Sequence, residues 1–133
     1  MKYCIDTNII IYAAKGTYPA IERHFEQTPS SSIVIPTIVI AEIEYGARKS
    51  DNYEKTMQAY KPFINSFEWV EFSKEASESY GKIRAELEMA GQTIGANDLI
   101  IASIAASEGD VLVTHNKKKF SRIPGLKIED WTE

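Results

Sequence analysis

The stretch YCIDTNIIIY, residues 3–12, decides the fold of this chain. Its apolar start at residues 3–5 predicts a short buried strand that ends on Asp6, and residues 9–13 predict the opening of a helix. In an open α/β sheet, ligands bind outside the carboxyl ends of the strands, where the strand order reverses. The first strand usually lies at that point, so we expect Asp6 to project into a crevice. The alternative is that Asp6 only caps the helix behind it.

The rest of the chain alternates short apolar runs with helical patterns. Further strands are predicted at residues 33–35, 69–72 and 111–113, with an edge strand at 126–128. Helices are predicted at residues 20–27, 37–48 with Thr37 as the N-cap, 52–65, 74–90 with Gly91 just past the end, and 99–106. This alternation predicts an α/β fold, a three-layer α/β/α sandwich with a mostly parallel sheet of four to five strands. The length of 133 residues predicts one domain, residues 1–133.

Composition narrows the class of protein. A hydrophobic content of 44% with 26% charged residues is typical of a globular protein, and no apolar run approaches the roughly 20 residues that span a bilayer. The start of the chain does not have the pattern of a signal peptide. The single cysteine, Cys4, cannot form an intrachain disulfide and is expected in the core. We therefore expect a cytoplasmic protein with no membrane segment.

Charge is distributed unevenly along the chain. The net charge of −4 argues against coating nucleic acid by bulk electrostatics. Residues 111–128, however, contain five basic residues and no acidic one, while the remainder has ten basic against 19 acidic residues. The basic residues considered for RNA binding are Lys117, Lys118, Lys119 and Arg122. The alternative for the three lysines is a solvated loop.

Glu42 differs from its neighbour Glu44 in the predicted helix at 37–48. Glu44 has Arg48 at i+4, the spacing of an ordinary exposed ion pair. Glu42 instead has Ile38 one turn before it and Tyr45 one turn after it, so it shares the apolar face. A carboxylate facing an apolar environment is costly unless it is paired or bound to a metal. This placement favours a functional Glu42 over a residue at the rim.

Asp98 is the third carboxylate at a sheet edge or helix start. An acidic residue in a first helical turn is favoured by the helix dipole and by capping, which is the structural alternative. Asn97 can provide the cap instead and leave Asp98 facing outward. Thr114 and Asn116 follow the fourth strand, at the same sheet edge as Asp6. If the acidic residues converge there, a divalent cation is needed to neutralise them.

The ligand types indicate which ion. Carboxylates with water-filled positions suit Mg²⁺ or Mn²⁺ and not zinc. His24 and His115 have no cysteine or histidine partner at zinc spacing, and His115 is interpreted as a loop or RNA-contact residue. There is no glycine-rich phosphate loop and no nucleophile-elbow serine. A phospho-aspartate phosphatase is disfavoured because its second aspartate is replaced by Asn8.

Several segments, taken together in order and spacing, resemble one protein family. They are residues 5–8 (IDTN), 40–43 (IAEI), 83–87 (IRAEL), 94–98 (IGAND), 112–116 (LVTHN) and 124–131 (PGLKIEDW). The chain resembles a PIN domain and, more narrowly, the VapC toxins of bacterial VapBC toxin–antitoxin pairs. The resemblance covers essentially the whole chain.

The resemblance implies a Mg²⁺-dependent endoribonuclease, with Mn²⁺ as an alternative ion. It implies that Asp6 and Asp98 coordinate the metal, and that Glu42 is their acidic partner, often through water. Further site residues implied are Thr7, Asn8 and Thr114 as polar supports, and Asn116 as a neutral ligand or water-positioner. The family commonly has a fourth acid at one of two positions, which here hold Asn116 and Lys119. This departure leaves open whether one metal ion is bound or two.

The resemblance also implies a substrate and partners. It implies cleavage of structured RNA, with the anticodon loop of initiator tRNA as the first choice. It implies a homodimer and a VapB-like antitoxin that inserts a segment, often with an arginine, into the acidic site. Two alternatives stay open: a PIN-like module that has lost catalysis and binds RNA or protein, and an unrelated α/β protein whose acids are only helix caps.

Overall fold

The computed structural model describes all 133 residues as alternating strands and helices. The strands are β1 (Tyr3–Ile5), β2 (Ile33–Pro36), β3 (Glu68–Val70), β4 (Val111–Val113) and β5 (Lys127–Glu129). The helices are α1 (Thr7–Lys15), α2 (Pro19–Gln27), α3 (Thr37–Lys49), α4 (Tyr53–Ile64), α5 (Lys74–Met89), α6 (Ala96–Glu108) and α7 (Lys117–Phe120), with a short 3-10 turn, η1 (Ser30–Ser32).

The sheet has five parallel strands in the order β3-β2-β1-β4-β5. The chain builds outward from β1 to β2 and β3 on one side, then crosses back to β4 and β5 on the other. The strand order therefore reverses beside β1, as expected from the opening stretch. Ile5 pairs with Val113, which places the residues after both strands next to each other at one sheet edge.

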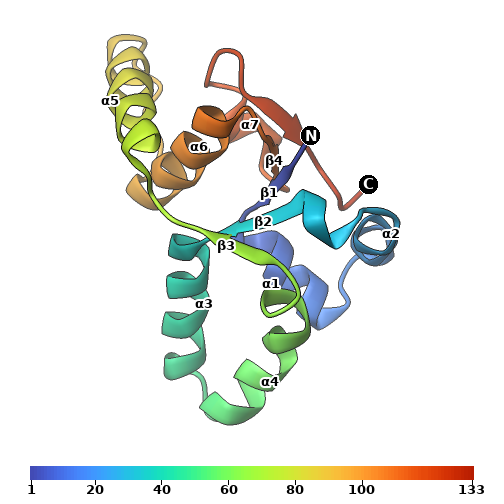
Figure 1. The fold of residues 1–133 in the computed structure, drawn as a ribbon. Helices are drawn as coiled ribbons and strands as arrows, with labels where there is room; N and C mark the ends of the chain where they lie inside the picture. Colours follow the sequence, from blue (N-terminus) through green and yellow to red (C-terminus); the bar gives the residue numbers. More distant parts are fainter.

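Helices cover both faces of the sheet. In Figure 1, α1, α3 and α4 lie together on one side, and α5 and α6 lie together on the other. Right-handed crossovers require this division, because the first half of the chain adds strands on one side of β1 and the second half adds them on the other side. The predicted three-layer α/β/α sandwich is confirmed. No helix is both long enough and apolar enough to cross a membrane.

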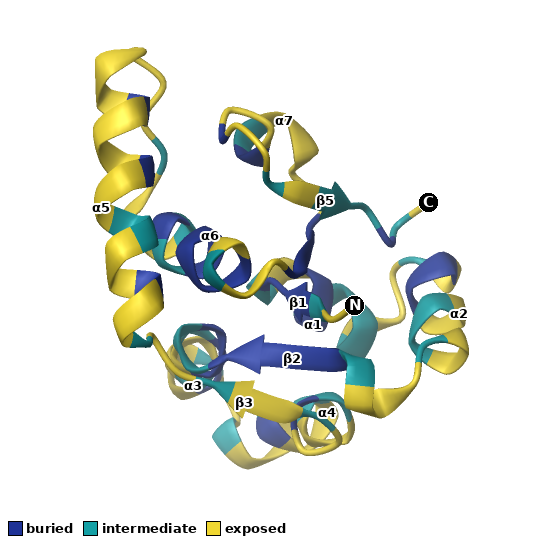
Figure 2. Cartoon of the chain, turned by 45° about the horizontal axis from the view of Figure 1, so that its top comes forward, coloured by how far each residue is buried: buried dark blue, intermediate teal, exposed yellow.

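The core is formed by the three central strands and the faces of the helices that cover them. β2 is buried along its whole length, while the edge strand β3 is largely exposed (Figure 2). The helix α6 has six buried residues, and α5 only a narrow buried stripe. Near the end of the chain Trp131 is 1% exposed, so the tail also belongs to the core.

Some local expectations were wrong in detail. Pro36, not Thr37, is the N-cap of α3, since β2 runs directly into the helix and Thr37 already has helical geometry. The lysine run is not a loop but the short helix α7, capped by the Asn116 side chain. Gly91 does lie just beyond α5 with φ of +66°, the left-handed conformation that ends the helix.

Candidate active site

A cleft of about 490 Å³ opens at the carboxyl end of β1. Its walls come from the end of β1 and the starts of α1 and α6, with one face of α3 between them. The lining residues are Asp6, Thr7, Asn8, Ile11, Ile38, Ala41, Glu42, Tyr45, Asn97 and Asp98. The cleft therefore contains the three carboxylates that the sequence singled out.

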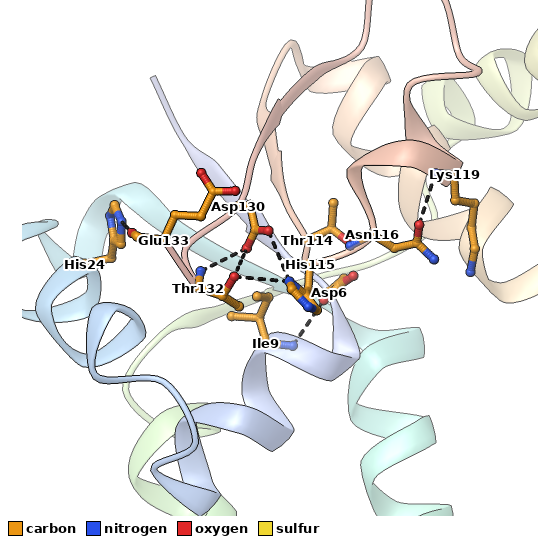
Figure 3. Close-up of polar contacts among 10 residues, drawn as sticks. All are labelled: Asp6, Ile9, His24, Thr114, His115, Asn116, Lys119, Asp130, Thr132 and Glu133. Carbon is orange, nitrogen blue, oxygen red and sulfur yellow. Dashed lines mark hydrogen bonds and ion pairs between the residues drawn. The ribbon is translucent and has the colours of Figure 1, made fainter.

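Asp6 is both a helix cap and a cleft residue. Its Oδ1 accepts a hydrogen bond of 3.2 Å from the backbone N–H of Ile9, and the residue is only 7% exposed (Figure 3). Burial raises the pKa of Asp6 from its ordinary value near 3.8 to about 6, and the nearby charge of Asp98 adds to the rise. Hydrogen bonds from Thr114 and Ile9 and the charge of Lys119 lower the pKa again. Asp6 therefore caps α1 and also lines the cleft, so the two interpretations drawn from the sequence are compatible.

Glu42 reaches the cleft from α3. Its Oε1 accepts a hydrogen bond of 2.5 Å from the Thr7 hydroxyl, which connects α3 with the start of α1. Its Oε2 has no hydrogen-bond partner within the chain. Ile38 and Tyr45, one turn away on either side, line the same cleft. Glu44, by contrast, pairs with Arg48 at 3.8 Å, as its spacing predicted.

Asp98 lies in the first turn of α6 without capping it. The N-cap is Gly95, so neither Asn97 nor Asp98 fills that role. The Oδ2 atom of Asp98 lies 2.7 Å from Nζ of Lys119, and both side chains are about one-third exposed. Its Oδ1 accepts no hydrogen bond within the chain. Asp98 therefore has one oxygen paired with a lysine and one without a hydrogen-bond partner, on a residue that lines the cleft.

Thr114 and Asn116 lie between β4 and α7, and neither lines the cleft. Thr114 is fully buried, and its Oγ1 accepts a 3.0 Å hydrogen bond from the Asn116 backbone N–H. The Oδ1 of Asn116 accepts from the backbone N–H of Lys119 at 3.1 Å and so caps α7. Asn116 does not line the cleft, and its predicted role as a ligand or water-positioner stays a prediction.

The four basic residues at α7 are not equivalent. Lys117 and Lys118 are exposed and form no ion pair. Lys119 turns toward Asp98, and Nη1 of Arg122 donates to the backbone carbonyl of Thr93 at 3.0 Å. Of these four basic side chains, two lysines are therefore unpaired, and Lys119 and Arg122 each contact another part of the chain.

The donor set of the cleft suits a hard divalent cation. All polar groups offered by Asp6, Glu42 and Asp98 are carboxylate oxygens, and neither histidine lies in the cleft. No three acidic, histidine or cysteine side chains lie close enough together to hold a metal ion jointly. Glu42 is held by Thr7 and Asp98 by Lys119, so each carboxylate is positioned separately.

A second polar network joins the end of β4 to the tail of the chain. Nδ1 of His115 lies 3.1 Å from Oδ2 of Asp130 and 3.1 Å from Oγ1 of Thr132 (Figure 3). The ring of His115 also contacts Tyr12 and Tyr18 at centroid distances of 5.8 and 5.5 Å. Sequence reasoning missed this network, because no local spacing links residues of β4 with the tail.

Tyr45 was also not assigned to the site, although it lines the cleft and is 65% exposed. Its position one turn after Glu42 was the available signal, since residues three or four apart share a helix face.

The fold and the site define an α/β protein of the PIN-like class, with an acidic cleft where the strand order reverses. The PIN domain family model matches residues 3–126. The chain belongs to the PIN domain family and, within it, to the VapC group.

Relatives along the full length place it in that group. Ribonuclease VapC2 of Rickettsia felis is 40% identical, with 98% of each chain covered. The tRNA(fMet)-specific endonuclease VapC of Salmonella typhimurium is 37% identical, again over 98% of each chain. A crystal structure of DNA-bound VapBC from Salmonella typhimurium superposes with a TM-score of 0.92 at 37% identity, covering 98% of both chains.

Proposed function

We propose that this protein is a divalent-metal-dependent endoribonuclease and the toxin of a type II toxin–antitoxin pair. The observation that carries the proposal is that Asp6, Glu42 and Asp98 all line one cleft at the carboxyl end of the central strand. Its relatives named ribonuclease and endonuclease over their full length support the same reading.

Asp6 and Asp98 are the residues proposed to hold Mg²⁺, or Mn²⁺ in its place. When bound, the ion supplies an activated water and offsets charge on the phosphoryl oxygens. Oδ1 of Asp98 is the oxygen proposed to face the ion, and Oε2 of Glu42 the oxygen proposed to face a water, because Lys119 and Thr7 contact the other oxygen of each carboxylate.

The protein's own side chains do the positioning. Thr7 holds Glu42 in one orientation at the cleft, so that Oε2 can orient a water against the scissile phosphate. The buried Asp6 is anchored through Ile9 and Thr114 and is proposed to stay fixed while RNA binds. Asn8 and Asn116 are proposed as further polar supports.

The proposed substrate is tRNA, cut in the anticodon loop of initiator tRNA. This is supported by the relative from Salmonella typhimurium, named as tRNA(fMet)-specific. Lys117, Lys118 and Arg122 are proposed to hold the RNA backbone beside the cleft, since exposed cations bind phosphates without reading sequence. Lys119 is proposed to contact the RNA as well, from its position beside Asp98 at the edge of the cleft.

The proposed partner is a VapB-like antitoxin, as in the VapBC complexes of Rickettsia felis and Salmonella typhimurium. An arginine of such a partner would pair with the cleft carboxylates and compete with the metal. We further propose a homodimer that acts in the cytoplasm, where its tRNA substrate is found.

The test is cleavage of a total tRNA pool by the purified protein. With Mg²⁺ we expect discrete fragments, and we expect none with EDTA or with Asp6→Asn. Asp51→Asn is the matched control, because Asp51 is an exposed carboxylate outside the cleft and should leave cleavage intact.

Intact RNA under all of these conditions, with RNA still bound, would instead support the second candidate, a PIN-like module that only binds. The separate positioning of the carboxylates and the pairing of Lys119 with Asp98 are the observations that favour this candidate.

A further inference from the structure

Lys119 differs from the other two lysines of α7 in where its side chain lies. Its Nζ atom is 2.7 Å from Oδ2 of Asp98, 21 residues earlier in the chain. Its backbone N–H donates to Oδ1 of Asn116 at 3.1 Å, which fixes the backbone of Lys119 at the start of α7 (Figure 3). Lys117 and Lys118 remain exposed.

The ammonium of Lys119 changes the charge of the cleft. Three ionised carboxylates give −3, which one divalent cation leaves under-neutralised and two divalent cations over-neutralise. With Lys119 at the edge the charge is −2, which a single divalent cation neutralises completely. A second cation would have to approach both the ammonium and the first ion.

The ion pair occupies only part of the Asp98 carboxylate. Lys119 contacts Oδ2 of Asp98 at 2.7 Å, and Oδ1 accepts no hydrogen bond within the chain. Asp98 therefore keeps one carboxylate oxygen without a partner while its other oxygen is held by the ammonium.

We propose that Lys119 is a positioning residue that holds Asp98 and supplies the positive charge of a second cation, so that the cleft binds one divalent ion. This rests on the proposed function, because it concerns the metal that the nuclease would use. The family commonly has a fourth acid at one of the two positions that hold Asn116 and Lys119 here, and the binding of a single ion accounts for its replacement.

The test counts ions and does not depend on RNA cleavage. Mn²⁺ is titrated into the purified protein, and free Mn²⁺ is followed by electron paramagnetic resonance. We expect one Mn²⁺ per chain for the unsubstituted protein and for Lys119→Arg, which keeps the charge. We expect two for Lys119→Glu, which exchanges the ammonium for a carboxylate. Lys118→Glu is the matched control, because it adds the same charge on the same helix outside the site, and should bind one.

Lys119→Met provides a second readout if Lys119→Glu does not fold, as judged by circular dichroism. Removing the repulsion between the ammonium and the ion should tighten Mn²⁺ binding about fivefold, with the count still one. Two ions bound by the unsubstituted protein, one ion bound by a folded Lys119→Glu, or unchanged affinity in Lys119→Met would each overturn the inference. If the unsubstituted protein binds no Mn²⁺ at all, the metal-dependent function itself fails, which is a distinct result.

Discussion

At the scale of single residues, Asp6 combines a stabilising and a destabilising contribution. As an N-cap it satisfies the Ile9 backbone N–H and its charge is favoured by the start of α1. Burial nevertheless makes the charged form costly, and the pKa of about 6 reports that burial dominates. A buried charge that lowers stability is commonly retained because a site needs it.

This predicts that Asp6→Asn stabilises the protein at neutral pH in the absence of metal. The raised pKa means that the folded state binds the proton more tightly than the unfolded state, so Asp6 costs stability as the pH rises from about 4 through about 6. Asn caps a helix as well as Asp and carries no charge. In urea unfolding with EDTA at pH 7.5, we expect the free energy of unfolding to rise by about 1–3 kcal/mol.

The direction of the stability change and its dependence on pH distinguish the Asp6→Asn effect from a general effect of removing a carboxylate. Below pH 4 the gain should disappear, since Asp6 is then protonated in both states. Asp98→Asn is the control and should lower stability slightly, by about 0.5–1 kcal/mol, because it removes the ion pair with Lys119. A variant Asp6→Asn less stable than the unsubstituted protein at pH 7.5 would contradict the argument.

At the scale of elements, α7 is a short basic helix whose lysines point in two directions, one toward the cleft and two toward solvent. Asn116 starts the helix, and Phe120 anchors it in the core. Between them, Lys119 faces the site while Lys117 and Lys118 face solvent. The helical geometry therefore explains why three consecutive lysines have different surroundings.

We predict that Lys117→Gln combined with Lys118→Gln weakens RNA binding and its dependence on salt. Each phosphate contact to a single strand contributes about 0.7 to the slope of log affinity against log salt, so the slope should fall by about 1.4. Binding of tRNA is measured by fluorescence anisotropy at several salt concentrations, in an Asp6→Asn background that prevents cleavage.

The control pair is Lys74→Gln with Lys82→Gln, which removes the same charge from the exposed side of α5. Its slope should stay that of the starting protein. Equal slopes for the two double variants would show that net charge, and not α7, governs RNA binding.

At the scale of the whole molecule, the tail closes the fold against the N-terminal half. Trp131 packs on Tyr3 of β1 at a centroid distance of 5.5 Å and stacks on His24 of α2 at 5.0 Å. Phe25 contacts the same ring edge-on at 5.2 Å. One buried indole thus joins three segments that are distant in sequence.

Trp131→Ala should therefore lower the free energy of unfolding by about 3–5 kcal/mol, the usual cost of removing a large buried aromatic side chain. Urea denaturation followed by circular dichroism measures it. Trp69→Ala is the comparison, since Trp69 lies on the edge strand and is 46% exposed. It should cost clearly less, and equal losses would refute the role given to the tail.

The sequence by itself determined the strands and the longer helices, the fold class and the family, but not the short helix α7. Strand and helix periodicities are local, so the strand after residue 2 and the long helix at 74–90 were predicted within one or two residues. The three acids were recognisable because each lies at a strand end, at a helix start or on an apolar helix face, where an unpaired charge is costly and indicates a functional role.

Only the tertiary structure decided which side chains meet. It placed Thr7 on Glu42, Lys119 on Asp98, and His115 on Asp130, pairs separated by 15 to 35 residues. Such pairs depend on strand order and on the direction in which each side chain leaves its helix, and neither is encoded in local spacing. A lysine that composition assigned to an RNA-binding surface is therefore found beside a carboxylate of the cleft, because the packing of α7 against the sheet sets its direction.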